Sequence, residues 1–359
     1  MSIYQRFLKQ GPVIASAPCR IDFGGTLDIR TFHYPLRPYR PCTFNVAIGM
    51  RTRVMLLPGT EGEIRVESKG FDPAVFPVRG ANLKHPLGLF AAIALFWGMD
   101  GIVIRIESAS PPRSGLGGSS AAAVAVMAAC CKAAEVHGKG GDSPREIVSL
   151  AHAAEESIAG VPCGLQDQLA AAYGGVNLWS WQDGVCTAAF RRQVMIPVRK
   201  AVRLKKHLAL AYCGIPHESK SVNQTWIQQF LAGRFHREWI EIIQLTRQFG
   251  SAVAIEDVPA AVALMRRELE IRMHMTPDVL DDVGRRLVAE AEKADCGARF
   301  TGAGAGGCIW AYGRETDIDN LRRTWGEMLQ DVPDGMLLPV DIDVQGLHCA
   351  RLQDSSHGT

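Results

Sequence analysis

The 359-residue sequence lacks the patterns that mark several common classes of protein. It has ten cysteines but no C-x-x-C pair and no H-E-x-x-H motif, the close groupings that zinc sites usually need. Neither sign of charge dominates, since 39 basic residues stand against 37 acidic ones. A near-neutral balance gives no reason to expect a nucleic-acid or membrane-surface partner. The composition therefore favours neither a zinc protein nor a nucleic-acid-binding one.

Long apolar runs are also missing. Residues 87–99 are too few to cross a bilayer, which takes about 20 residues, and the small-residue run after Ser119 is interrupted by Lys132. The first ten residues have no apolar centre, so we expect no signal peptide. The cysteines are scattered apart from the adjacent Cys130 and Cys131, which predicts reduced, packed thiols. We expect a cytoplasmic protein.

The length allows one large domain or two ordinary ones, and 47% hydrophobic residues suit a globular chain. Short Val- and Ile-rich segments predict early strands, and apolar residues at helical spacing predict that helices follow. We expect strands over 13–17, 51–57, 63–67, 102–107, 207–213 and 337–344, and a strand-loop-strand over 299–312. We expect helices from Ser119, over 143–160, 221–230, 235–249 and 259–273, from Thr276, and over 317–330. Ser143, Pro144 and Glu146 suggest a capping box, and Gly160 a C-cap.

The basic stretch 190–205 marks a soft boundary and is either a solvated surface segment or a binding surface. We place domains at 1–195 and 196–359.

The most informative segment is a glycine- and serine-rich loop between a predicted strand and a predicted helix. It reads P-P-R-S-G-L-G-G-S-S-A-A over residues 111–122. Glycines let the backbone approach an anion closely, and a helix N-terminus offers free N–H groups. A glycine turn with a serine cap would read the same way. The Walker pattern is excluded, because no G-K-[ST] follows.

Three other segments carry polar residues or glycines in unusual density. The loop 301–308 has more glycines than a two-residue hairpin needs, which suits close approach to a ligand or another backbone better than a floppy hairpin does. Asp167 follows a capped helix among polar and glycine neighbours, where it could also be a simple cap. Residues 17–28 combine a strand with Arg20, Asp22, Asp28 and a glycine pair; alone they would be a strand ending in a turn.

Together and in this order, the four segments resemble those of the GHMP small-molecule kinases, which include galactokinase, homoserine kinase, mevalonate kinase and phosphomevalonate kinase. Residues 18–28 are similar to the family's first motif and 111–122 to its ATP loop. Residues 301–308 resemble the third motif, T-G-A-G-G-G-G-C, with Ala305 replacing one glycine. Residues 166–168 and 172–177 resemble the sugar 1-kinase branch of heptose-phosphate kinases and fucokinases. The resemblance spans nearly the whole chain.

The resemblance implies a role for each matching residue. Asp167 would take or steer the proton of the attacking sugar hydroxyl, and Arg20 would stabilise charge on the phosphate. ATP would be held by Ser114, Gly115, Leu116, Gly117, Gly118, Ser119, Ser120 and Ala121. Mg²⁺ would be held by Ser119 or Ser120, which stay open, and by Glu156. The acceptor would be held by Asp28, Gly164, Gln166, His217, Gly304 and Gly306.

Two of these assignments keep an alternative. Glu156 is eleven residues before Asp167, which matches mevalonate kinases, although on a helix it lies opposite the apolar stripe while Glu155 flanks that stripe. His217 and Lys220 open a predicted helix after a strand, where they could hold a phosphorylated sugar or could be exposed charges beside a helix cap.

The expected fold is therefore the two-domain α+β architecture of GHMP kinases, with an N-terminal half like ribosomal protein S5 domain 2 and a ferredoxin-like C-terminal half. The expected activity is Mg-ATP-dependent phosphorylation of a sugar or sugar phosphate, at the anomeric hydroxyl. Three alternatives remain: a kinase for a non-sugar alcohol such as mevalonate or homoserine, a related decarboxylase, and a non-catalytic sensor of sugar and nucleotide. The sequence predicts no oligomeric state.

Overall fold

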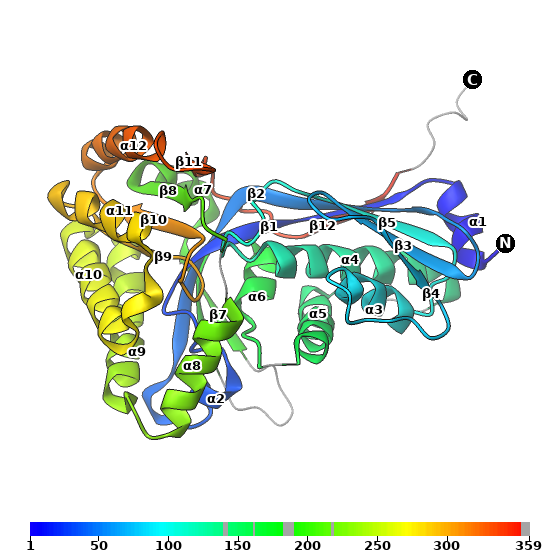
Figure 1. The fold of residues 1–359 in the computed structure, drawn as a ribbon, viewed down its shortest axis with the longest axis horizontal. Helices are drawn as coiled ribbons and strands as arrows, with labels where there is room; N and C mark the ends of the chain where they lie inside the picture. Colours follow the sequence, from blue (N-terminus) through cyan, green and yellow to red (C-terminus); the bar gives the residue numbers. More distant parts are fainter. Residues whose placement is uncertain (139–142, 161, 182–189, 217–218, 353–359) are drawn as a thin grey trace.

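The computed structural model describes residues 1–138, 143–160, 162–181, 190–216 and 219–352, built around two β-sheets (Figure 1). The larger sheet has the strand order β12-β1-β2-β5-β3-β4, with β6 paired to β2 and β7 to β6. All its pairs are antiparallel except β3 with β5. Its strands are β1 (Val13–Phe23), β2 (Cys42–Pro58), β3 (Glu63–Ser68), β4 (Ala74–Pro77), β5 (Ile102–Ser108), β6 (Val176–Trp181), β7 (Phe190–Ile196) and β12 (His348–Arg351).

Helices cover one face of this sheet. They are α3 (Gly88–Phe96), α4 (Gly118–Ala134), α5 (Pro144–Ala159) and α6 (Gln166–Tyr173), with α1 (Ile3–Lys9) at the end of the sheet and α2 (Arg30–His33) after β1 (Figure 1). The helix at Gly118–His137 is long and apolar enough to cross a membrane, but 78% of that window is buried inside the protein. Its small residues let α4 pack directly on β1 and β2, so it is the central helix of the core.

The smaller sheet has the order β11-β8-β10-β9, with antiparallel pairs throughout. Its strands are β8 (Leu208–Cys213), β9 (Gly297–Phe300), β10 (Cys308–Tyr312) and β11 (Gly335–Leu337). The helices of this half are α7 (Val198–Ala201), α8 (Ser219–Leu231), α9 (His236–Ala254), α10 (Val258–Met275), α11 (Asp282–Lys293) and α12 (Glu315–Leu329). The two halves share a core, because Phe249 of α9 stacks on Phe23 of β1 at 4.2 Å between ring centroids.

Most predicted elements are present, and the mixed α+β class is confirmed. The nine described cysteines form no disulfide, consistent with the expected reduced thiols, while Cys186 lies outside the described residues. The predicted capping box at Ser143 is wrong, because its side chain makes no cap hydrogen bond, although Gly160 does end α5 with φ at 66°. The predicted helix from Thr276 is also wrong. A short 3₁₀ turn (Pro277–Val279) stands there, and α11 begins after Asp281, whose carboxylate accepts from Gly284 N–H.

The end of the chain departs most from the sequence prediction. The predicted strand over 337–344 reduces to β11, which ends at Leu337. The chain then returns to the larger sheet, where β12 pairs with β1 and Arg51 of β2 contacts Asp343. A division at 195/196 remains our proposal: β7 ends at Ile196 and the smaller sheet begins at Leu208, while β12 rejoins the first half.

Candidate active site

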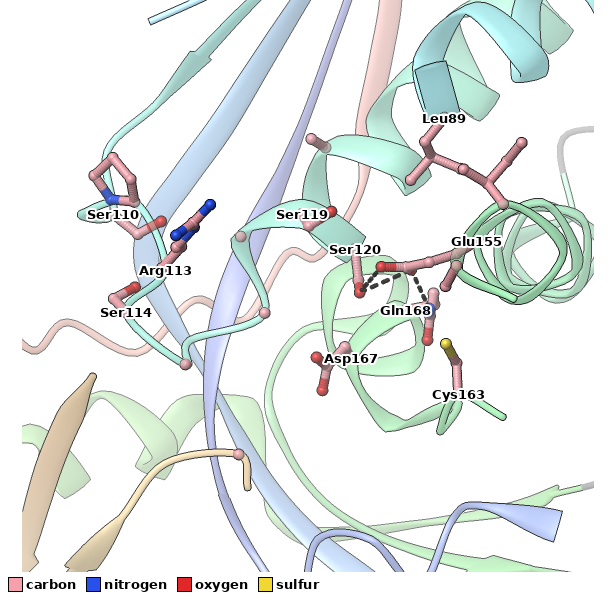
Figure 2. Close-up of a pocket in the computed structure, with 18 of the residues that line it drawn as sticks. Leu89, Ser110, Arg113, Ser114, Ser119, Ser120, Glu155, Cys163, Asp167 and Gln168 are labelled. Atoms are coloured by element: carbon pink, nitrogen blue, oxygen red, sulfur yellow. Dashed lines mark hydrogen bonds between the residues drawn. The ribbon is translucent and has the colours of Figure 1, made fainter. Parts of the chain in front are cut away.

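A cavity of about 1280 Å³ opens between the two halves. Its walls come from the end of β1, the loop before α4, the start of α6, the segment before α3, α8 and the loop after β9. Figure 2 shows Ser119 and Ser120 at the start of α4, opposite Glu155 and above Asp167. The four segments that the sequence singled out therefore meet at one place, although they span nearly 300 residues of chain.

The glycine-serine loop enters α4 in a conformation that suits an anion. Gly115 and Gly117 have φ of 73° and 75°, and Gly117 is the N-cap, so no side chain caps the first N–H groups of α4 among the described residues. A Cβ on Gly117 would lie 3.1 Å from an oxygen of Asp167. The glycine thus brings the loop backbone directly against this carboxylate.

Not every residue of the predicted ATP loop reaches the cavity. Ser114, Gly115, Gly117, Gly118, Ser119 and Ser120 line it, whereas Leu116 and Ala121 are fully buried behind it. Leu116 instead accepts a hydrogen bond from the Arg20 N–H through its carbonyl at 3.0 Å, which joins the loop to β1. The side chains of these two residues, which were expected to help hold ATP, lie in the core and support the loop from behind.

Asp167 and Arg20 form the centre of the site. Nε and Nη2 of Arg20 lie 2.8 and 2.7 Å from Oδ1 of Asp167, and Nη1 donates to the Gly115 carbonyl at 2.5 Å. Burial raises the pKa of Asp167 above its usual value, while the positive charge of Arg20 opposes that rise. The carboxylate is thus oriented by Arg20 and kept more basic than an exposed aspartate.

Asp28 lies beside the start of α6. Its Oδ2 accepts from the Gln166 N–H at 3.0 Å, and burial raises its pKa to about 6. A Cβ on Gly164 would lie 1.9 Å from the same oxygen, so a larger residue at that position would displace the Asp28 carboxylate. Asp28, Gly164 and Gln166, which were expected to hold the acceptor, all line the cavity, and Asp28 also positions the helix that carries Asp167.

The glutamate nearest the serines is Glu155. Its carboxylate accepts from Ser120 Oγ at 2.9 Å and from Gln168 Nε2 at 2.7 Å, and burial raises its pKa to about 7 (Figure 2). Glu156 is absent from the cavity lining and lies 3.5 Å from Arg30 Nη2 at the surface. The carboxylate that faces the serines is therefore that of Glu155, which flanks the apolar stripe of α5, and not that of Glu156, which the sequence favoured as the metal ligand.

The second glycine loop supports the site more than it lines it. Gly302 and Ala303 reach the cavity, and Thr301 Oγ1 donates to the Ser114 carbonyl at 3.3 Å. Gly304 and Gly306, which were expected to help hold the acceptor, are not among the residues that line the cavity. A Cβ on Gly304 would meet the Val279 carbonyl at 2.5 Å, so this glycine allows two backbones to approach. His217 and the Lys220 side chain lie outside the described residues.

Two walls of the cavity were missed by sequence reasoning. One is the face of α8 that presents Asn223, Gln224 and Gln228, whose i, i+4 spacing within a predicted helix was an available signal. The other contains the apolar side chains of Phe71, Leu83, Leu89 and Phe90 beside two lysines and a histidine of the same segments. Nothing in the sequence pattern joins the end of β3 to the segment before α3, because only tertiary packing brings them together.

Comparison with known proteins identifies a family model that matches part of the chain. Residues 85–175 match the family model described as GHMP kinases N terminal domain. No curated protein sequence matches. At 19% identity the structure resembles a D-glycero-D-manno-heptose 1-phosphate kinase from Bacteroides thetaiotaomicron, with a TM-score of 0.70 over 95% of this chain and 100% of that one.

Two further solved structures share the fold. A Lactococcus lactis galactokinase complexed with galactose has 16% identity and a TM-score of 0.71, over 98% of this chain and 99% of that one. A Streptococcus pneumoniae phosphomevalonate kinase, in complex with phosphomevalonate and AMPPNP, has 13% identity and a TM-score of 0.69, over 94% and 99%. The chain thus contains a GHMP kinase N-terminal domain and has the two-domain GHMP kinase fold that its motifs predicted.

Proposed function

We propose that this protein is a Mg-ATP-dependent kinase that transfers the γ-phosphate of ATP to a sugar hydroxyl, most simply the anomeric one. One observation carries the proposal: Asp167, held by Arg20, faces the uncapped start of α4 inside a cavity that both halves line. A base and an anion site in contact are the two requirements of phosphoryl transfer to an alcohol. The kinase neighbours support this reading.

The walls of the cavity suit two different ligands. The apolar side chains of Leu83, Leu89 and Phe90 suit the base of a nucleotide, with its phosphates at the start of α4. Asp28 and the amides of α8 suit hydroxyl groups. Figure 1 shows α3 and α8 on opposite sides of α6, so a nucleotide and an acceptor would approach Asp167 from opposite directions.

In this mechanism Asp167 accepts or steers the proton of the acceptor hydroxyl as its oxygen attacks the γ-phosphorus. The raised pKa of Asp167 makes it a stronger base than an exposed aspartate, and it must be ionised to act. Arg20 holds the carboxylate in one orientation and presents positive charge beside the transferring group. The protein's contribution is positioning and charge stabilisation, without a covalent intermediate.

The residues beside α4 also fit a magnesium ion. Among the described residues no group of three or more His, Cys, Asp and Glu side chains could hold a metal, so a site would need other oxygens. Ser120 and the buried carboxylate of Glu155 offer hard oxygen ligands in contact, and magnesium usually completes its shell with phosphates and water. Glu155 and Ser120 would hold the ion, with Ser119 at the mouth; the bound ion would neutralise phosphate charge.

A second candidate is a kinase for a non-sugar alcohol. The likeness to a phosphomevalonate kinase favours it, since that neighbour matches almost as well as the sugar kinases. The amide-rich face of α8 favours a polyhydroxylated acceptor instead. A non-catalytic sensor is disfavoured because Arg20 and Asp167 are both in place.

The proposal is tested by measuring ADP release from Mg-ATP with a panel of acceptors. The panel contains free and phosphorylated hexoses, heptoses and deoxy-sugars, with mevalonate and homoserine as controls. We expect saturable release with at least one sugar, and NMR of the product identifies the phosphorylated hydroxyl. Turnover on mevalonate or homoserine alone would move the protein to another branch of the same fold. Bound nucleotide without turnover on any acceptor would support the sensor.

A further inference from the structure

Asp22 is a fully buried carboxylate at the end of β1, and the mechanism above does not use it. Its Oδ1 accepts from the Gly302 N–H at 2.7 Å and lies 3.3 Å from Nη1 of Arg20. One oxygen of Asp22 therefore touches both the second glycine loop and the arginine that holds Asp167.

The contacts of Arg20 divide its guanidinium between two sides. Nε and Nη2 face Asp167, while Nη1 lies between the Gly115 carbonyl and Asp22. A planar guanidinium that is hydrogen-bonded or ion-paired on both sides cannot rotate freely, so the direction of its N–H groups is fixed. Asp22 thus makes the ionic contact with the Arg20 guanidinium on the side away from Asp167.

Asp22 is held in turn by the C-terminal half. Nη1 of Arg299, on β9, donates to the Asp22 carbonyl at 2.6 Å and lies 3.5 Å from its Oδ2. Nε of Arg299 donates to Glu268 of α10 at 3.0 Å, and Glu268 also accepts from Arg272 at 2.9 Å. All these side chains are at most 1% exposed. Buried charges at such positions are strongly coupled because water does not screen them.

We infer that Asp22 is a positioning residue for phosphoryl transfer: it fixes the guanidinium of Arg20 from β1, with Arg299 and Glu268 of the other half fixing Asp22. The inference rests on the proposed kinase function. Asp22 does not reach the cavity lining, so its effect on the reaction passes through Arg20. The catalytic carboxylate would then be oriented only when both halves are docked.

The test is Asp22→Asn, assayed with the acceptor that the wild-type protein phosphorylates. Asparagine keeps the size and can still accept from Gly302, but it removes the charge that grips Arg20. We expect kcat to fall by about tenfold or more, while KM for ATP and the affinity for AMPPNP stay within about twofold. If Asp22 had only a structural role, the substitution would lower the melting temperature without this selective loss of kcat.

The matched control is Asp343→Asn, which removes another carboxylate–arginine contact, with Arg51 of β2, outside the cavity lining. We expect it to lower the melting temperature and to leave kcat within about twofold. If Asp22→Asn does not fold, Glu268→Gln serves as the test. Without the charge of Glu268, Arg299 would interact more strongly with Asp22 and so weaken the contact between Asp22 and Arg20. We then expect kcat to fall selectively, but by less than in Asp22→Asn.

An unchanged kcat in the folded Asp22→Asn protein overturns the inference. If Glu268→Gln is used because Asp22→Asn does not fold, an unchanged kcat in Glu268→Gln overturns it. Equal losses in Asp22→Asn and Asp343→Asn overturn it too. Lack of any transfer by the wild-type protein refutes the proposed kinase function itself, and the inference with it.

Discussion

At the scale of single residues, the site is defined by carboxylates that are buried next to one another. Burial raises the pKa of Asp167, brings that of Asp28 to about 6 and brings that of Glu155 to about 7. Carboxylates with perturbed pKa values in a cavity are typical of functional sites, because burying a charged group destabilises the fold and is retained where the group has a chemical role. Arg20 offsets part of this cost at Asp167.

The raised pKa of Glu155 predicts how stability depends on pH. Between about pH 4.5, where the unfolded chain loses this proton, and about pH 7, where the folded protein loses it, the folded state binds the extra proton. The contribution of Glu155 to the free energy of unfolding is therefore fully present below about pH 4.5 and is lost as the pH rises through about 7. Glu155→Gln removes the titration, so metal-free Glu155→Gln should gain on the order of 2 kcal/mol relative to wild type between pH 5 and pH 8.

Urea unfolding without divalent metal, at both pH values, measures this gain. Glu156→Gln is the matched control, since the neighbouring carboxylate pairs with Arg30 outside the cavity, and we expect a much smaller change with pH. A difference between Glu155→Gln and wild type that is the same at both pH values would show that Glu155 does not hold a proton in the folded state.

The sequence predicted single residues unevenly. The motifs were enough to predict that Asp167, Arg20 and Asp28 lie at one site, because each lies in a short segment with its neighbours fixed by chain connectivity. The choice between Glu155 and Glu156 needed geometry, since adjacent helical residues point about 100° apart and only the packing of α5 on α4 decides which one faces Ser120. Asn223 was missed because its helix is joined to the other motifs only by tertiary structure.

At the scale of elements, the site depends on loops that bring backbones unusually close. Glycines at 115, 117 and 164 each stand where a Cβ would meet an oxygen of Thr301, Asp167 or Asp28. The sequence predicted that these loops approach something closely, and the structure adds that for several of them the neighbour is the protein itself. That outcome could not be predicted from spacing, because a ligand and a second backbone impose the same requirement for glycine.

Gly164→Ala tests the contact between the α6 entry loop and Asp28. The added Cβ would lie 1.9 Å from Asp28 Oδ2, so the carboxylate must move and lose its hydrogen bond to the Gln166 N–H. We expect KM for the acceptor to rise by about tenfold or more while KM for ATP stays within about twofold. Steady-state kinetics with each substrate varied in turn makes the comparison.

Gly250→Ala is the control for that substitution. Gly250 lies inside α9, its nearest neighbour to an added Cβ is 3.4 Å away, and alanine favours a helix interior by about 1 kcal/mol. We expect unchanged kinetics and equal or higher stability. An unaltered acceptor KM in Gly164→Ala would mean that Asp28 does not contact the acceptor.

At the scale of the whole molecule, the cavity exists only because the two halves close on each other. The strand and helix periodicities predicted most elements, and the resemblance to GHMP kinases predicted how they assemble. The return of the chain to pair β12 with β1 was not predicted, since four residues at His348–Arg351 carry too weak a pattern. This strand and the Arg51–Asp343 contact tie the end of the C-terminal half to the sheet that carries Arg20.

The central claim is that Asp167 activates the acceptor at the point where the two halves meet. The most direct measurement is the rate of transfer by Asp167→Asn beside its affinity for AMPPNP, with the exposed Asp278→Asn as control. Asparagine can still accept from Arg20 but cannot take a proton. We predict that kcat falls by about 10² to 10⁴ while AMPPNP affinity stays within about twofold and the control is unaffected. A kcat within a few-fold of wild type would contradict the account.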